Sequence, residues 1–297
     1  MSFKEHIPVL LEEVLTAFAD KKIFRFLDAT LGAGGHALSL LKLHPEIFKY
    51  YGIDRDPKAI EISKNNLKEF SNKLVFYPTS FSTIKNLFEL SSLDGILADI
   101  GLSSIQLDDM ERGFSFKSDE AYLDMRMNYL SGKTAADVLN KYSEKELGNI
   151  FRELGEEPYW KQSAKAIVEY RKKNKFSTVG SLKAALQNVF PRFKLRKKIN
   201  PLTLIFQSLR ICVNDELEEL KKFIQDSFLL LAPQGRLVCI SFHSLEDRII
   251  KWSFREAQNN GIGKIVTKKP IIASYEETKN NRRSRSAKLR IFERYSL

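Results

Sequence analysis

From residue 23 onward, short apolar runs alternate with amphipathic stretches, a rhythm that predicts strands separated by helices. Apolar residues recur at helical spacing after the first two runs, in the segments GGHALSLLKLH and DPKAIEISKNNLKEF. Strands that alternate with helices predict an α/β fold with a mostly parallel, doubly wound sheet. The first four expected strands are IFRFLDAT (23–30), KYYGIDRD (49–56), NKLVFYPTSF (72–81) and LDGILADIGLSS (93–104).

The pattern changes after residue 104. Helix starts recur in the next hundred residues without a convincing strand, as in the capping-box spacings Thr134–Asp137 and Ser143–Glu146. The alternation then returns, with a long amphipathic helix (214–232), a fifth strand (234–242), another helix (247–258) and an expected antiparallel edge pair (263–272 and 287–296). We therefore expect an α/β domain formed by residues 1–104 and 205–297, with an all-helical domain, residues 105–204, inserted between its two parts.

The carboxyl ends of the expected strands are the candidate binding edge, because ligands of doubly wound sheets bind there. Polar or aromatic residues follow each strand. They are Asp28 to His36 after the first strand, Asp54 after the second, Ser80 and Phe81 after the third, and Asp99 to Gln106 after the fourth.

The turn after the first strand contains three glycines within four positions, and Gly32, Gly34 and Ala37 satisfy the spacing G-x-G-x-x-A. Such a turn can present the backbone N–H groups of a helix N-terminus to a nucleotide-like cofactor. Glycines in this arrangement can also serve close packing alone. The spacing leaves both interpretations open.

Two cofactors fit this turn. Asp54 lies 54 − 32 = 22 residues after Gly32, where a carboxylate can accept hydrogen bonds from the ribose of NAD or of S-adenosylmethionine. Asp28 favours S-adenosylmethionine, because a carboxylate suits the ammonium of its methionine end better than a pyrophosphate. Phe81 offers an aromatic face for adenine, and an antiparallel edge pair is common in methyltransferases. The Walker spacing is absent, which argues against phosphoryl transfer.

Composition adds a charge argument. The 297 residues carry a net charge of 48 − 37 = +11, which indicates a polyanionic partner or simply a basic soluble protein. Glutamates interrupt the apolar N-terminal pattern, and no apolar window reaches the roughly 18 residues of a membrane span, so we expect a cytoplasmic protein. Two cysteines and four scattered histidines have no zinc-ligand spacing, and we expect no metal.

Eight segments resemble, in order, the motifs of the bacterial 16S rRNA cytosine-N4 methyltransferase family. They are HIPVLLEEVL (6–15), DATLGAGGH (28–36), GIDRDPKAI (52–60), DGILADIGLSSIQLDDMERGFSF (94–116), LDMRMN (123–128), FQSLRICVNDELEEL (206–220), GRLVCISFHSLEDRIIK (235–251) and RSRSAKLRIFER (283–294). The resemblance implies a class I, Rossmann-like methyltransferase domain with a helical insertion after the fourth strand. It also implies S-adenosylmethionine as the cofactor and methylation of the exocyclic N4 of a cytidine in the decoding region of 16S rRNA.

The family motifs imply cofactor contacts at Gly34, Gly35, His36, Asp54, Phe81, Asp99 and Gln106. Ile105 stands where the family usually has proline, which loosens the turn that presents Gln106. The lone pair of a cytosine N4 is delocalised into the ring, so catalysis needs an acceptor where positive charge develops on nitrogen. Asp99 is the expected acceptor, with orientation of the cofactor's methionine end as its alternative role.

His243, which follows the fifth strand, is the second expected catalytic residue and could take the departing proton. Its alternative is a purely structural role in which Glu246 or Asp247 holds the ring.

Three basic stretches are expected to contact phosphates of the RNA, namely YRKKNK (170–175), RFKLRKK (192–198) and KNNRRSRSAKLR (279–290). DNA amino-methyltransferases often carry an Asp-Pro-Pro-aromatic motif where this chain has DIGLSS, which argues against a DNA substrate. The expected partner is therefore 16S rRNA, within the small ribosomal subunit. The alternatives are an NAD-dependent oxidoreductase and a ribosome-assembly factor that keeps the fold without the activity.

Overall fold

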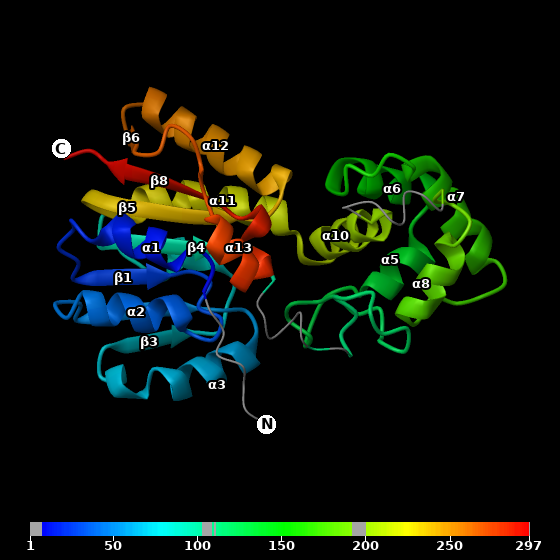
Figure 1. Ribbon diagram of the computed structural model, residues 1–297, viewed down its shortest axis with the longest axis horizontal. Helices are drawn as coiled ribbons and strands as arrows, with labels where there is room; N and C mark the ends of the chain where they lie inside the picture. Colours follow the sequence, from blue (N-terminus) through cyan, green and yellow to red (C-terminus); the bar gives the residue numbers. More distant parts are fainter. Residues whose placement is uncertain (1–7, 103–108, 110, 192–199, 297) are drawn as a thin grey trace. The chain divides into compact units, whose positions relative to one another are not determined.

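The chain folds into two compact units (Figure 1). The computed structural model describes residues 8–102, 109, 111–191 and 200–296. The sheet unit comprises residues 1–103 and 217–297, and the inserted unit comprises residues 104–216.

An eight-stranded sheet forms the centre of the sheet unit, in the order β3-β2-β1-β4-β5-β8-β6, with β7 paired to β8. The strands are β1 (Arg25–Asp28), β2 (Lys49–Ile53), β3 (Leu74–Tyr77), β4 (Leu93–Asp99), β5 (Leu231–Ser241), β6 (Gly263–Ile265), β7 (Ile271–Ile272) and β8 (Lys288–Arg294). The first five are parallel, whereas β8 is antiparallel to β5, and β6 and β7 are antiparallel to β8. The predicted α/β fold with a mostly parallel sheet is confirmed.

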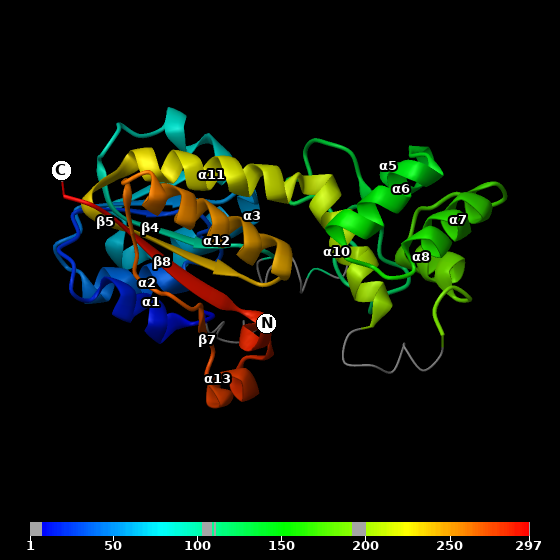
Figure 2. The ribbon, with the colours of Figure 1, turned by 90° about the horizontal axis from the view of Figure 1, so that it is seen from above.

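Helices cover both faces of this sheet, with α1 and α2 on one face and α11 and α12 on the other (Figure 2). The α-helices of the unit are α1 (Leu11–Phe18), α2 (Gly35–Leu43), α3 (Pro57–Asn66), α11 (Glu216–Leu230), α12 (Ser244–Asn259) and α13 (Tyr275–Asn280). Successive strand residues alternate between the two cores, so that Phe26 and Tyr50 face the first and Leu27 and Ile53 face the second. This alternation explains why both faces of the strands are apolar.

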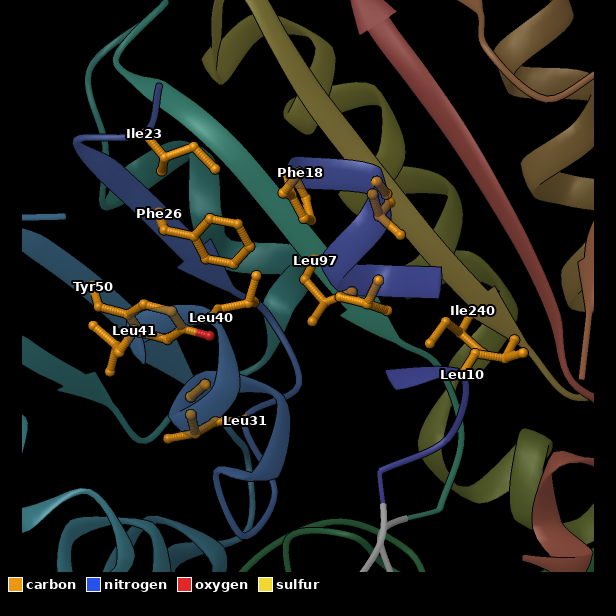
Figure 3. Packing of buried hydrophobic residues seen from close by; sticks show 14 of the residues in the cluster. Leu10, Phe18, Ile23, Phe26, Leu31, Leu40, Leu41, Tyr50, Leu97 and Ile240 are labelled. Carbon is orange, nitrogen blue, oxygen red and sulfur yellow. The ribbon is translucent and has the colours of Figure 1, made fainter. Parts of the chain in front are cut away.

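Phe26 of β1 is packed between aromatic rings in the first core (Figure 3). Its ring centroid lies 5.0 Å from that of Phe18 in an edge-to-face arrangement and 5.2 Å from that of Tyr50 in a stacked one. Phe26 and Tyr50 are also partners in the β1–β2 register. The packing therefore fixes β1 two residues before Asp28, the last residue of the strand.

The inserted unit is built from helices. They are α5 (Ala135–Lys141), α6 (Glu144–Asn149), the π-helix η3 (Ile150–Leu154), α7 (Trp160–Arg171), α8 (Val179–Leu186) and α10 (Pro201–Asn214). Capping boxes begin α5, with Thr134 and Asp137, and α6, with Ser143 and Glu146, as the sequence predicts. In the described part of this unit, the only β pairing is an isolated bridge between Tyr122 and Thr178.

The inserted unit extends to Glu216, whereas the sequence pattern places its end at residue 204. The difference is helix α10, which packs against α5 and η3. The ring of its Phe206 lies 5.6 Å from that of Phe116, and the side chain of Asn214 accepts a hydrogen bond from the Met127 N–H at 2.8 Å. An amphipathic pattern identifies a buried face but not its partner, so the expected boundary falls inside this helix.

Across the described ranges, every helix is too short or too polar to traverse a bilayer.

We expect Phe26→Ala to lower the free energy of unfolding by about 3–5 kcal/mol, because it leaves a cavity between two rings. Phe24→Ala is the matched control, since Phe24 lies two residues earlier and is 40% exposed. Its cost should be about 1 kcal/mol or less. Urea denaturation of both variants measures the difference, and equal costs would contradict the packing described here.

Candidate active site

The glycine turn links β1 to α2. Gly34 caps α2 in the left-handed conformation, with φ of 83° and ψ of 19°, and its N–H donates to the Leu31 carbonyl at 2.8 Å. A Cβ at Gly34 would lie 3.0 Å from a methyl carbon of Leu67, and one at Gly35 would lie 2.6 Å from Cγ of Pro8. The backbone conformation and the protein's own packing therefore already require glycine at these two positions.

Asp54, which directly follows β2, stabilises this turn through hydrogen bonds. Its Oδ2 accepts the Gly32 N–H at 2.9 Å, and its Oδ1 accepts the Asp56 N–H at 2.9 Å. Burial raises the pKa of Asp54 to about 6. A carboxylate oxygen accepts more than one hydrogen bond, so these contacts leave acceptor capacity for a sugar hydroxyl.

Asp28, at the end of β1, is 1% exposed. Its Oδ1 accepts the Thr30 N–H at 3.1 Å and its Oδ2 accepts the Tyr50 hydroxyl at 3.2 Å. Burial raises the pKa of Asp28 to about 7, and the nearby Asp54 adds to the effect.

Asp99 ends β4, the strand adjacent to β1. Its backbone N–H donates to Thr30 Oγ1 at 2.6 Å, while its side-chain Oδ1 is buried and has no hydrogen-bond partner in the described ranges. Burial, reinforced by the charges of Asp28 and Glu246, raises the pKa of Asp99 to about 8. A buried acceptor without a donor is costly, and such a group is a candidate for ligand binding or catalysis.

His243 and Glu246 form a reciprocal cap at the start of α12. The His243 Nδ1 accepts the Glu246 N–H at 3.4 Å, while Glu246 Oε2 accepts the N–H groups of Phe242 at 2.8 Å and His243 at 3.3 Å. The His243 Nε2 lies 2.9 Å from Glu246 Oε1. With Nδ1 accepting, the ring proton sits on Nε2, which lies close to Oε1 but is not aligned with it as a hydrogen bond. Asp247 instead binds Lys288 and Arg290.

Phe81 follows β3, at the start of the 3-10 helix η2 (Phe81–Asn86). Its ring meets that of Phe223 edge-on at 5.1 Å, and the Arg55 guanidinium lies 5.7 Å over its face. Arg55 also binds Ser80 at 2.9 Å and forms an ion pair with Glu219 of α11. A guanidinium held in this way contacts one face of the ring.

Asp28, Asp99 and Glu246, here called the carboxylate cluster, bring three acidic groups to one edge of the sheet. Like charges that are buried together disfavour ionisation, and a cation bound among them would relieve the repulsion. The cluster therefore suits a cationic ligand. A pyrophosphate would meet only further repulsion here.

Comparison with known proteins decides the family. The model of the MraW methylase family matches residues 3–295. The chain belongs to this family. It is 52% identical over 292 residues to "Ribosomal RNA small subunit methyltransferase H" of Chlamydia felis, with 98% of each chain covered. It is 50% identical over 296 residues to the protein of the same name from Chlamydia pneumoniae, with both chains covered in full. Among solved structures, an rRNA methylase from Streptococcus thermophilus aligns with a TM-score of 0.43 and 9% identity over 99% of this chain and 100% of that chain.

Membership confirms the resemblance identified in the sequence motifs, the enzyme class and S-adenosylmethionine as the cofactor of this methylase. The alternative of an NAD-dependent oxidoreductase is not favoured. The cofactor carries a sulfonium and an ammonium, so the chemistry of the carboxylate cluster and the donor-free Oδ1 of Asp99 fit it.

The structure brings most of the predicted site residues of the methylase to one edge of the sheet. Asp54, Phe81, Asp99 and His243 follow β2, β3, β4 and β5. His36 is different, since its buried ring contacts the Val9 carbonyl through Nε2 at 3.0 Å, within the first turn of α2. Gln106 and the basic stretch 192–198 lie outside the described residues.

Other residues at this edge were not assigned to the site from the sequence, where Glu246 was named only as an alternative partner of the His243 ring. Thr30 holds the backbone of Asp99, Tyr50 holds Asp28, and Glu246 belongs to the carboxylate cluster. Thr30 lies within the predicted strand-end segment, so its place could have been found. The contact of Tyr50 with Asp28 depends on strand register, for which the sequence carries no local signal.

The third basic stretch needs a correction. Its Lys288 and Arg290 lie in β8, and both bind the carboxylate of Asp247, at 3.1 Å and 2.7 Å. These two charges are therefore engaged within the protein. Arg282 and Arg285 of the same stretch are exposed.

The pKa of Asp99 predicts how stability depends on pH. With a pKa of about 8 the folded state holds the Asp99 proton, whereas the unfolded chain loses it near the ordinary aspartate pKa of 3.8. Between these values the folded state binds more protons, so the free energy of unfolding falls as pH rises, by at most about 1.4 kcal/mol per pH unit for this group. Asp99→Asn should remove this contribution. The free energy of unfolding of the variant should therefore increase relative to that of the parent as pH rises through this range.

Denaturant unfolding of the cofactor-free protein at a series of pH values measures this effect. Glu89→Gln, which removes an exposed carboxylate of the sheet unit, should follow the parent at every pH. An Asp99→Asn curve that stays parallel to the parent from pH 4 to pH 8 would contradict the assignment.

Proposed function

We propose that this methylase transfers a methyl group from S-adenosylmethionine to the exocyclic N4 of a cytidine in the decoding region of 16S rRNA. The names of relatives that cover nearly the whole chain at 50–52% identity support a small-subunit rRNA substrate. The segment DIGLSS at the end of β4 and the net charge of +11 favour RNA over DNA or an uncharged substrate. A ribosomal substrate places the enzyme in the cytoplasm.

The proposed cofactor-binding residues are Gly34, Gly35, His36, Asp54, Phe81, Asp99 and Gln106. All but Gln106, which lies outside the described residues, are found along the carboxyl edge of the sheet and in its loops. Asp54 is proposed to bind the ribose, and Phe81 is proposed to contact adenine. His36 is proposed to act through its backbone N–H in the first turn of α2, because its ring is bound to Val9. When bound, S-adenosylmethionine supplies an electrophilic methyl group on a sulfonium.

The observation that carries the catalytic proposal is the buried Oδ1 of Asp99, which has no hydrogen-bond partner among the described residues. An acceptor held there in advance stabilises an amine on which positive charge develops, without reorganisation during the reaction. The raised pKa of Asp99 reports the protein alone. A cationic group among the three carboxyl groups lowers that pKa and so favours the charged, accepting form.

His243 is proposed as a positioning residue, although the sequence suggested a proton acceptor. Its two ring nitrogens both face Glu246, which favours the structural alternative. In this role the ring holds Glu246 in place, so that the charge of Glu246 acts on Asp99.

The decisive experiment incubates the purified methylase with labelled S-adenosylmethionine and small subunits from a strain lacking its gene, followed by mass mapping of the rRNA. We expect one labelled cytidine, in the decoding region, with the methyl group on N4. Large subunits serve as the control and should stay unlabelled. Binding of small subunits without transfer would favour the assembly-factor alternative, and a label on another base would overturn the proposal.

Asp99→Asn tests the acceptor role. The substitution keeps the shape but replaces the charge with an amide, so an interaction that grows in the transition state is lost from turnover. We expect the single-turnover rate at saturating cofactor to fall about a hundredfold, or about 2.7 kcal/mol. Cofactor affinity should fall much less.

Asp94→Asn is the matched control, because Asp94 lies near the other end of β4 and accepts the N–H groups of Phe24 and Arg25. It should leave the rate unchanged. A normal rate in Asp99→Asn combined with a large loss of cofactor affinity would reassign Asp99 to binding the cofactor's ammonium.

A further inference from the structure

The outer face of α12 carries an exposed tryptophan among three cations. Arg248, Trp252 and Arg255 follow one another at intervals of four and three residues, so they share one side of the helix, with Lys251 beside them. Trp252 is 57% exposed, and Arg248 and Arg255 are exposed as well. We call these four residues the α12 stripe.

The fold gives no reason for a tryptophan at this position. The inward side of α12 already supplies Ile250, Phe254 and Ala257 to the second core. Large aromatic side chains bury much area when they have a partner, so an indole left in solvent is a candidate contact residue.

Two cations of the stripe lie over the indole ring. The Arg255 guanidinium carbon lies 5.0 Å from the Trp252 ring centroid, and the Lys251 Nζ lies 5.7 Å from it. In the described ranges no carboxylate lies within ion-pair distance of Lys251 or Arg255. Their charges therefore lie beside an aromatic ring without a carboxylate partner among the described residues.

Acidic groups on α12 do not cancel this charge. Glu246 is buried and forms the cap with His243, and Asp247 is bound by Lys288 and Arg290. Glu256 is the one exposed acid of the helix. Lys251 and Arg255 together outnumber this one acid, so the outer face is positive, which favours a polyanion over an apolar or basic partner.

The stripe also starts close to the proposed active site. α12 begins directly after His243 and contains Glu246 of the carboxylate cluster. At about 1.5 Å per residue, Arg248, Trp252 and Arg255 follow Ser244 by roughly 6, 12 and 17 Å along the helix axis. A chain bound along α12 would thus run from the reacting edge of the sheet over a length of a few nucleotides.

We propose that the α12 stripe binds a single-stranded segment of the substrate RNA, with an unpaired base stacked on Trp252 and phosphates bound by Arg248, Lys251 and Arg255. Aromatic faces bind single-stranded RNA by stacking, and cations beside them bind the backbone. The proposal rests on the proposed rRNA substrate, and it adds a binding surface that is separate from the cofactor residues.

Fluorescence of the full chain tests the stacking directly. Trp160 and Trp252 are the two tryptophans of the chain, so Trp160→Phe leaves Trp252 as the sole indole reporter. Titration with a protein-free single-stranded RNA oligonucleotide should quench this signal. In binding assays, Trp252→Ala should weaken affinity for the oligonucleotide about tenfold or more, and Trp252→Phe should recover most of the loss.

The cations are tested by salt dependence. Replacing Arg248 and Arg255 together by Gln should lower the slope of log affinity against log salt by about 0.7 for each lost phosphate contact. S-adenosylmethionine affinity should stay at the parent value in all these variants. Phe48→Ala is the matched control, because Phe48 is 49% exposed beside Arg25 but precedes β2, at the opposite edge of the sheet. It should change neither RNA affinity nor salt slope.

Several outcomes overturn the proposal. An unchanged affinity of Trp252→Ala for RNA, or an unchanged salt slope, removes the stripe as an RNA surface. A loss confined to intact subunits, with normal binding of protein-free RNA, assigns the stripe to a ribosomal protein. A change of sedimentation in Trp252→Ala without a change in RNA binding assigns it to a second copy of the chain. If the parent protein methylates 16S rRNA in any of these cases, the proposed function stands and only the α12 stripe is rejected as an RNA surface. A parent protein that neither binds nor methylates RNA rejects the proposed function and the RNA surface together.

Discussion

Asp28 and Asp99 stand at the carboxyl ends of adjacent parallel strands, and the charge of Glu246 reaches Asp99 from the start of α12. Burying these groups together opposes their ionisation, and much of the surrounding structure serves to hold them in place. Thr30 donates its N–H to Asp28 and accepts the N–H of Asp99, so a single residue connects both strand ends. The cores on the two faces of the sheet make this arrangement possible, because they fix the strands before the polar edge is reached.

This arrangement also explains why the edge suits a methyl donor. A site for a neutral or anionic ligand gains nothing from accumulated carboxyl groups, whereas a cationic ligand relieves a repulsion that the protein bears by itself. The protein thus forgoes some stability at the site where it binds, as is common in enzymes. The Arg55–Glu219 ion pair also stabilises this edge of the sheet. It connects α11 to the residue that follows Asp54 at the end of β2.

The sequence predicted those parts of the fold that depend on local pattern. Short apolar runs identified β1 to β5, and the spacing of Thr134 and Asp137 identified the start of α5. It also predicted which strand ends carry the candidate site, because parallel strands place their carboxyl ends on one edge. Contacts between distant segments were not predictable. The extent of the inserted unit depends on what α10 packs against, and the contact of Tyr50 with Asp28 depends on strand register. The cap between His243 and Glu246 is local, and the sequence offered it as the structural alternative.

The glycine turn shows a second limit of prediction from sequence. Its spacing suggested close approach of a cofactor, yet Leu67 and Pro8 already occupy the space that side chains at Gly34 and Gly35 would need. A sequence motif records that a side chain is excluded without recording what excludes it. Both requirements can act at one position, and the packing requirement is the one visible in the protein alone.

The sheet unit is discontinuous in the chain, since residues 104–216 lie between β4 and its neighbour β5. During synthesis, β1 to β4 therefore emerge from the ribosome well before β5, the strand that pairs with β4. Until β5 arrives, β4 presents an unpaired apolar edge, the kind of surface on which nascent chains associate wrongly. An inserted unit that folds quickly, through helices with mostly local contacts, would shorten the path over which β5 must find this edge. The insertion thereby sets the order in which the protein can assemble, quite apart from any role in binding RNA.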